Sequence, residues 1–146
     1  MKKLVIAGTL TMFIFAIVSL GGYVIVREYI TTREQNEVYD VTMPVQNASK
    51  PQVAQIMVTN WLHRFTTRRF VSKIYEYKIH SIDIGEEGGN YFVFTAEFSV
   101  KADKETTWKD VPHIVDGDWI RVKGQFRINQ AGNVYHLVGL GYKVPT

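Results

Sequence analysis

Residues 91–102 read YFVFTAEFSVKA and alternate apolar with polar side chains. Successive side chains of a β-strand point to opposite faces of its sheet, so this alternation predicts a strand with one buried and one exposed face. The pattern recurs from Trp119 to Asn129. Together the two segments predict an antiparallel sheet that is exposed to water on one side. The expected inner faces comprise Phe92, Phe94, Ala96, Phe98 and Val100 in the first segment, and Ile120, Val122, Gly124, Phe126 and Ile128 in the second.

Two further strands are expected on either side of these segments, at Ile74–Ile84 and at Val134–Lys143. Gly85–Asn90 has the composition of a hairpin loop, and Gln130–Asn133 has that of a turn. The C-terminal half of the chain therefore predicts a curved, four-stranded antiparallel sheet.

A helix is expected before the sheet, from Lys50 to Phe65 or Thr67. Ser49 is a favourable N-cap, and Gln52 follows three residues later as in a capping box. The expected apolar face consists of Ala54, Met57, Val58, Trp61 and Phe65. An amphipathic helix of this kind covers one face of a sheet, so residues 49–146 are expected to form an α+β domain.

The N-terminal region carries a long apolar run, residues 4–26, LVIAGTLTMFIFAIVSLGGYVIV. A helix of this length extends about 34 Å, enough to cross the hydrocarbon core of a bilayer. Lys2 and Lys3 precede the run and favour a cytoplasmic N-terminus. We expect a cytoplasmic tail at 1–3, a single-pass membrane anchor at 4–26, a polar stalk or linker at 27–48 and an extracytoplasmic domain at 49–146.

Cleavage as a signal peptide is the alternative, since Ser19-Leu20-Gly21 has small residues at a suitable spacing. The apolar run is longer than the usual h-region, which favours an uncleaved anchor. The alternative product is a secreted domain. The chain contains no cysteine, so it cannot be a lipoprotein or use a cysteine nucleophile.

The charge balance gives little support to nucleic-acid binding. Lys2 and Lys3 are two of the 17 basic residues, so residues 27–146 hold 15 basic against 14 acidic ones. The pI of about 9.1 therefore does not indicate a concentrated patch of basic residues in the domain. Motifs for serine hydrolases, phosphate-binding loops and zinc helices are absent, and His113, Asp116 and Asp118 match no metal motif. We expect no cofactor, no metal and no enzymatic activity.

A partner surface is expected at one end of the sheet. Asp103–Asp118 is a long connection, and long loops in compact domains are often functional. The expected partner contacts are two tryptophans and a row of basic residues on the outward face of the third strand: Trp108, Trp119, Arg121, Lys123 and Arg127. For Trp108 the alternative is an anchor that folds the loop back onto the sheet. The basic row can also meet anionic lipid headgroups.

A pocket between helix and sheet is the remaining possibility for enzymatic chemistry. It would need one buried acid or base. His136 is the first candidate because it shares a strand phase with Val134, Val138 and Leu140, and Asp83 is the second.

The order of these elements resembles the NTF2-like superfamily and the related cystatin-like arrangement of a helix on a sheet. The resemblance is carried by Gln52–Phe65, Tyr91–Lys101 and Gly117–Gly141, including Gly117-Asp118-Trp119-Ile120, Gly124-Gln125-Phe126 and Asn133-Val134-Tyr135. With its anchor, the layout is similar to VirB8-like components of bacterial conjugation and type IV secretion systems.

The resemblance implies a membrane-anchored assembly module of the bacterial cell envelope, which binds other envelope proteins or copies of itself. A small-ligand binder and a pocket enzyme remain as alternatives. They differ in what they require: an enclosed apolar pocket for the binder, and a buried His136 or Asp83 for the enzyme.

Overall fold

The computed structural model describes the backbone of residues 39–42 and all of residues 47–67 and 72–146. The expected membrane anchor at 4–26, the cytoplasmic tail and most of the linker lie outside these residues. Within the described ranges, no helix combines the length and the apolar character that crossing a membrane requires.

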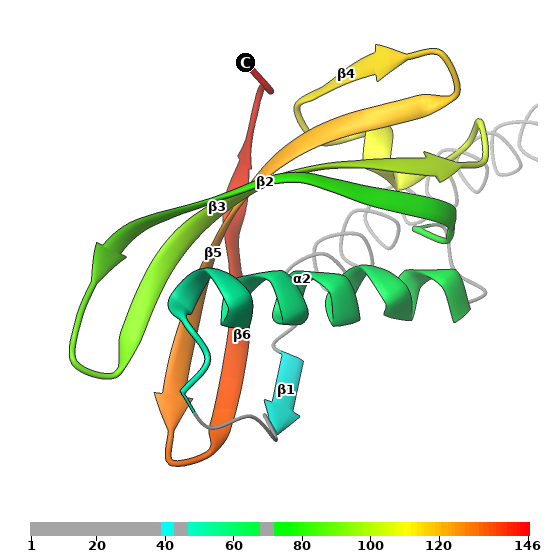
Figure 1. The fold of residues 1–146 in the computed structure, drawn as a ribbon. Helices are drawn as coiled ribbons and strands as arrows, with labels where there is room; N and C mark the ends of the chain where they lie inside the picture. Colours follow the sequence, from blue (N-terminus) through cyan, green and yellow to red (C-terminus); the bar gives the residue numbers. More distant parts are fainter. Residues whose placement is uncertain (1–38, 43–46, 68–71) are drawn as a thin grey trace, which may run out of the picture. The chain divides into compact units, whose positions relative to one another are not determined.

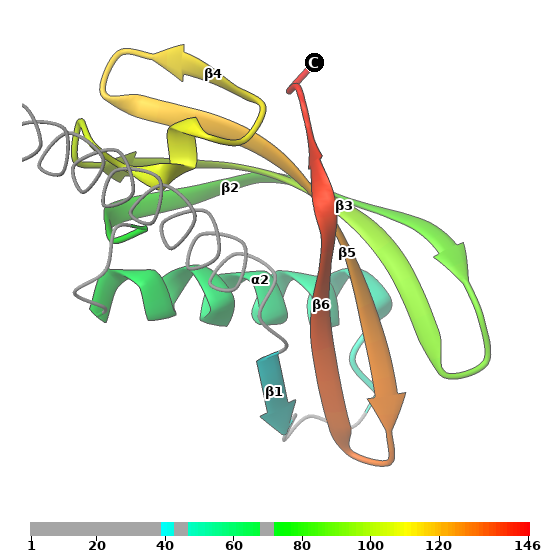
Figure 2. The same cartoon turned by 180° about the vertical axis from the view of Figure 1, so that it is seen from behind.

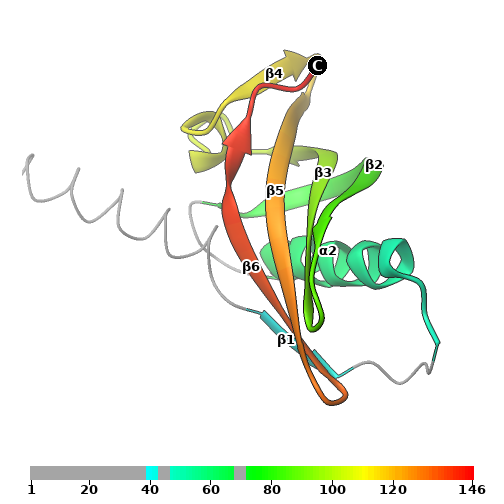
Figure 3. The same ribbon diagram turned by 90° about the vertical axis from the view of Figure 1, so that its left-hand side faces the viewer.

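One helix packs on a curved antiparallel sheet, so the predicted α+β fold is confirmed (Figure 1). Figure 3 shows β6, β5, β3 and β2 side by side, with α2 crossing one face. The strand order is β1-β6-β5-β3-β2, and β4 pairs with the first residues of β5. The elements are β1 (Tyr39–Thr42), α2 (Lys50–Thr67), β2 (Ile74–Glu87), β3 (Tyr91–Ala102), the 3-10 helix η1 (Thr107–Lys109), β4 (His113–Asp116), β5 (Trp119–Ala131) and β6 (Val134–Lys143).

The sheet contains two short strands, β1 and β4, in addition to the four strands expected from the sequence. Tyr39–Thr42, expected in the linker, forms β1 and pairs with Val134–Leu137 of β6. Part of the expected loop 103–118 forms η1 and β4, which joins β5 through a two-residue turn at Gly117, where φ is +59°. Strands of four residues are too short to show alternation, so only pairing with a longer neighbour defines them.

The N-terminal cap of α2 confirms the expected capping box. The Ser49 backbone N–H donates to Gln52 Oε1 at 2.9 Å, and the Gln52 N–H donates to Ser49 Oγ at 3.4 Å. These reciprocal bonds satisfy backbone donors that a helix start otherwise leaves without partners. The sequence therefore sets where the helix begins.

The curvature of the sheet comes from β2. Its register with β3 shifts at Ile74/Glu76, Ile79/Ser81 and Ile84/Glu87, and at each place β2 carries one more residue than β3. Such β-bulges bend the strand and increase its twist. With three of them, β2 and β3 wrap around α2 instead of forming a flat layer.

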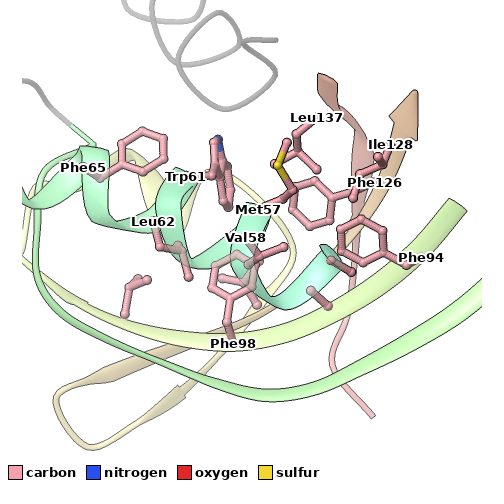
Figure 4. Packing of buried hydrophobic residues seen from close by; sticks show 14 of the residues in the cluster. Met57, Val58, Trp61, Leu62, Phe65, Phe94, Phe98, Phe126, Ile128 and Leu137 are labelled. Atoms are coloured by element: carbon pink, nitrogen blue, oxygen red, sulfur yellow. The ribbon is translucent and has the colours of Figure 1, made fainter. Parts of the chain in front are cut away.

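An aromatic cluster fills the space between α2 and the sheet. The Trp61 ring of α2 meets the rings of Phe65, Phe98, Trp108 and Phe126 edge-on, at centroid distances of 5.2–5.9 Å. Figure 4 shows Met57 and Trp61 projecting from the helix toward the phenylalanines of the strands. We call these five rings the aromatic cluster. Because each is at most 2% exposed, the helix–sheet interface is a packed core.

Trp61→Ala is expected to lower the free energy of unfolding by about 3–5 kcal/mol, because it removes the central ring of the aromatic cluster and leaves a cavity. Urea unfolding followed by the fluorescence of the remaining tryptophans measures the change. Ile56→Ala is the matched control on the same helix, since Ile56 is 37% exposed. Equal losses for the two variants would contradict a core centred on Trp61.

Candidate functional site

The expected basic row lies on the outer face of the sheet, which is the face opposite α2. Arg121, Lys123 and Arg127 alternate along β5 with the buried residues Val122 and Phe126, as the sequence predicts. Their neighbours on β3 are outward-facing as well, because Arg121 is opposite Ser99 and Lys123 is opposite Glu97. The row therefore occupies the centre of the outer face.

Arg121 forms an ion pair with the largely buried Glu97, while its own side chain is 39% exposed. Its guanidinium donates through Nε and Nη2 to Glu97 Oε1, and Glu97 is 7% exposed. A carboxylate at this depth needs a cation beside it, because solvation by water is mostly lost. Arg121 thus has a structural role within the sheet, in addition to any role in docking.

Lys123 and Arg127 also have partners within the chain. Lys123 Nζ donates to Thr146 Oγ1 at 3.1 Å, at the C-terminus. Arg127 Nε donates to Asn129 Oδ1 at 2.9 Å, and its guanidinium lies 4.2 Å from the centroid of the Tyr91 ring. These weaker, half-exposed contacts leave Lys123 and Arg127 accessible to a partner.

Trp119 forms a cation–π site at the start of β5. The ammonium of Lys78 lies 4.3 Å from the centroid of its ring, and that of Lys101 lies 4.7 Å away. Lys101 Nζ also forms a salt bridge with Glu76 Oε1 at 3.5 Å. The indole is half-buried, so it presents an apolar surface bordered by positive charge.

A groove of about 520 Å³ begins beside Trp119, at the end of the sheet. Its lining comes from the start of β2, the end of β3, η1 and the β4–β5 hairpin, which lie at the same end of the sheet (Figures 1 and 2). We call it the sheet-end groove. It is lined by Tyr75, Lys101, Ala102, Asp103, Lys104, Lys109, Val115, Gly117, Asp118, Trp119 and Ile120.

Cations outnumber anions in the sheet-end groove. Three lysines line it against two aspartates, and Asp103 accepts a hydrogen bond from the Tyr75 hydroxyl at 2.8 Å. This hydrogen bond raises the pKa of Tyr75, because it stabilises the protonated hydroxyl beside a carboxylate. Because Lys101 is also paired with Glu76, the groove carries both signs of charge with little excess of either.

The structure corrects the role expected for Trp108. This side chain is 0% exposed in the aromatic cluster, and its Nε1 donates to the carbonyl of Ser72 at 2.9 Å. A fully buried ring cannot contact a partner, so the expected partner contact is wrong. The alternative, an anchor that folds the 103–118 segment onto the core, is the one that the structure contains.

The pocket that the sequence left possible around His136 and Asp83 is not formed by these residues. His136 is opposite Asn129 on the outward phase of β5, while its neighbour Leu137 is 1% exposed in the core. Asp83 is exposed on β2. The expected inward phase is wrong because Val134 and Val138, which share it, are opposite Ala131 and Arg127 on the outward phase of β5, whereas the core-facing residue is Leu137.

One contact between an imidazole and a hydroxyl is not predicted by the sequence. His80 Nε2 lies 2.7 Å from Ser99 Oγ, on the outer face. The β2 bulge between Ile79 and Ser81 inserts His80 there, and no sequence motif marks it. Ser99 is 3% exposed, so a substrate cannot reach its hydroxyl and the contact is structural.

Metal ligation finds no support in residues 47–67 and 72–146, which contain no group of three or more His, Asp or Glu side chains placed to hold an ion. His113, considered from the sequence, has its Nδ1 at 2.8 Å from the Val111 carbonyl.

Comparisons with known proteins identify no relative: no family model matches the chain, and neither curated proteins nor solved structures match it.

Arg121→Gln is expected to lower the free energy of unfolding by about 1.5–3 kcal/mol, because Glu97 then stays buried without its cation. Lys123→Gln, on the same strand and face, is the control and should change stability by less than about 0.5 kcal/mol. Chemical denaturation compares the two variants. An unchanged free energy of unfolding in Arg121→Gln would show that the ion pair does not stabilise the fold.

Trp119 is expected to dominate quenching of tryptophan fluorescence by iodide, because Trp61 and Trp108 are 1% and 0% exposed. Iodide should quench more strongly than caesium, since Lys78 and Lys101 attract anions to the ring. Lys78→Gln should reduce the difference between the two ions, while Lys143→Gln should not. Quenching that persists in Trp119→Phe would mean that another tryptophan is accessible.

Proposed function

We propose that this chain is a non-enzymatic, membrane-anchored interaction module of the bacterial cell envelope, which docks partner proteins or copies of itself. The observation that carries the proposal is the distribution of chemistry in the folded domain. The helix–sheet interface is filled by the aromatic cluster, whereas the accessible cations and Trp119 lie on the outer face and in the sheet-end groove. Such a distribution favours recognition at the surface over chemistry in an internal pocket.

The proposed anchor is the apolar run Leu4–Val26, with the N-terminus in the cytoplasm and the domain outside. The sheet begins at Tyr39, thirteen residues after Val26. A fully extended chain of that length spans about 45 Å, so the anchor would keep the domain within that distance of the bilayer. Confinement near the membrane raises the local concentration of envelope partners.

The resemblance to NTF2-like and cystatin-like domains, and to VirB8-like secretion components, leads us to propose a scaffold of a conjugation or type IV secretion system. The antiparallel sheet covered by a helix is compatible with either superfamily. A scaffold requires self-association or stable contacts with other membrane proteins, and the proposed docking surface consists of Trp119, Lys123 and Arg127.

A small-ligand binder is the second candidate, since the volume of the sheet-end groove falls within the range of small-molecule sites; its lysine and aspartate lining suits a polar ligand and differs from the apolar pocket expected from the sequence. In this case the groove would bind its ligand without partner proteins. Co-purification separates the two candidates.

Crosslinking of the full-length chain in intact cells, followed by mild detergent extraction and mass spectrometry, tests the proposal. A defined set of envelope proteins is expected, and deletion of residues 1–26 should remove it. Recovery of the chain alone, soluble and shortened near Gly21, would contradict both the anchor and the scaffold.

The docking surface is tested by Lys123→Gln combined with Arg127→Gln, which should reduce the crosslinked set severalfold. Arg121 is left unchanged because its pairing with Glu97 supports the fold. Lys50→Gln combined with Arg64→Gln removes two charges from α2, on the other side of the sheet, and should leave the set unchanged.

A further inference from the structure

We propose that β4 pairs with the β4 strand of a second copy of this chain, so that the sheets of the two copies join across a twofold axis. The inference rests on the proposed function, in which the module docks copies of itself, and it assigns that contact to one strand edge.

One edge of β4 is open. Among the described strands β4 pairs with β5 alone, and its residues Ile114 and Val115 are 41% and 60% exposed. Figure 3 shows β4 at the top of the sheet, close to the C-terminus. An open edge recognises another extended chain, because its unpaired N–H and C=O groups can continue the sheet.

β4 lacks the features that protect β2, which is at the other end of the strand order. The pairing of β2 with β3 contains three bulges, whereas the pairing of β4 with β5 has no register shift. β4 reads HIVD and contains neither proline nor lysine. Bulges, prolines and lysines are common means by which an edge strand avoids pairing, so β4 is the edge that suits a partner strand.

The ladder with β5 determines which backbone groups of β4 are free. Asp116 and Trp119 flank the two-residue turn at Gly117, so they form a hydrogen-bonded pair, and such pairs alternate along an antiparallel ladder. His113 and Val115 therefore direct their backbone N–H and C=O groups away from β5. These two residues lie symmetrically on either side of Ile114.

This symmetry fits a second β4 strand in antiparallel orientation. When Ile114 is opposite Ile114 of the second copy, His113 of each copy is opposite Val115 of the other, and the free backbone groups form about four hydrogen bonds. Ile114 then occupies a non-hydrogen-bonded pair, in which the Cα atoms are about 4.5 Å apart. The two exposed isoleucine side chains cover each other on the outer face.

The same register brings opposite charges together, which favours a second copy over an unrelated strand. Along one edge of β5, β6 ends at Lys143 one residue pair before β4 begins at His113. Asp116 of the second copy lies two residues beyond Ile114 and therefore reaches this junction. Asp116 and Lys143 are both exposed on the outer face, and the twofold axis repeats their contact.

Four paired residues bury less surface than a standard protein–protein interface, so we expect the contact to be weak in free solution. The proposed anchors would confine both copies to one membrane and raise their local concentration. The dimer is therefore expected in membranes.

The test is oxidative crosslinking of full-length single-cysteine variants in membranes, for which the chain is suited because it contains no cysteine. Ile114→Cys is expected to form a disulfide-linked dimer, since the Cα separation of its pair is within the range of disulfides. Val115→Cys is the matched control. Its side chain is more exposed, but its Cα atoms in the two copies would be about 8 Å apart, which is too far for a disulfide.

Ile114→Cys should therefore give severalfold more dimer than Val115→Cys on a non-reducing gel. Equal crosslinking of the two variants would overturn the proposal, because random collision follows exposure and not register. The absence of a dimer with Ile114→Cys would overturn it as well.

Val115→Pro, added to Ile114→Cys, tests the backbone pairing. Proline removes the outward N–H of residue 115 and leaves the bonds between β4 and β5 in place, so the dimer should decrease severalfold while urea unfolding stays unchanged. An undiminished dimer would overturn the pairing of backbone edges.

A charge exchange tests the second copy as the partner. Asp116→Lys in the Ile114→Cys chain should reduce the dimer, and Lys143→Glu in the same chain should restore it. A dimer that Lys143→Glu does not restore would overturn the twofold register.

The cellular crosslinking experiment separates this inference from the proposed function. Envelope proteins recovered without any dimer of the chain overturn the inference and leave the interaction module intact. Recovery of neither envelope proteins nor a dimer overturns the proposed function itself. Loss of the dimer in Val115→Pro, with the envelope proteins retained, supports the inference.

Discussion

The packing of Trp61 against the curved sheet is the contact on which the rest of the structure depends. One helix can bury its apolar face on a sheet of long strands only if the strands bend around it, and the three bulges of β2 provide that bend. The aromatic cluster then fills the enclosed space with rings from the helix, from β3 and β5, and from η1. Because the interior is occupied, the chemistry available to other molecules is at the outside of the domain and at the end of the sheet.

The outer face shows that a row of basic residues on a strand can combine several roles. Arg121 neutralises a carboxylate that is almost fully buried, so its loss affects folding before it affects binding. Lys123 has an exposed contact and Arg127 a part-buried one, and both can exchange them for a partner. Experiments that remove the whole row would mix a folding effect with a docking effect, whereas variants of Lys123 and Arg127 separate the two.

The sheet-end groove also depends on the aromatic cluster. Trp108 anchors η1 to the aromatic cluster, and η1 contributes Lys109 to the lining of the groove. The groove combines residues from β2, β3, η1, β4 and β5, so distant parts of the chain form it together. The groove therefore forms only when the 103–118 segment is folded onto the core.

The sequence by itself determined the periodic elements: the capped helix that starts at Lys50, the existence of the four long strands, the inner faces of β3 and β5, and the outward direction of Arg121, Lys123 and Arg127. These follow from alternation, helical spacing and capping, which are local properties. Tertiary structure alone decided the burial of Trp108, the short strands β1 and β4, the outward phase of His136 and the meeting of His80 with Ser99. Bulges and short strands leave no periodic signal, because a single inserted residue reverses the phase of a strand and four residues gain order only by pairing with a longer neighbour.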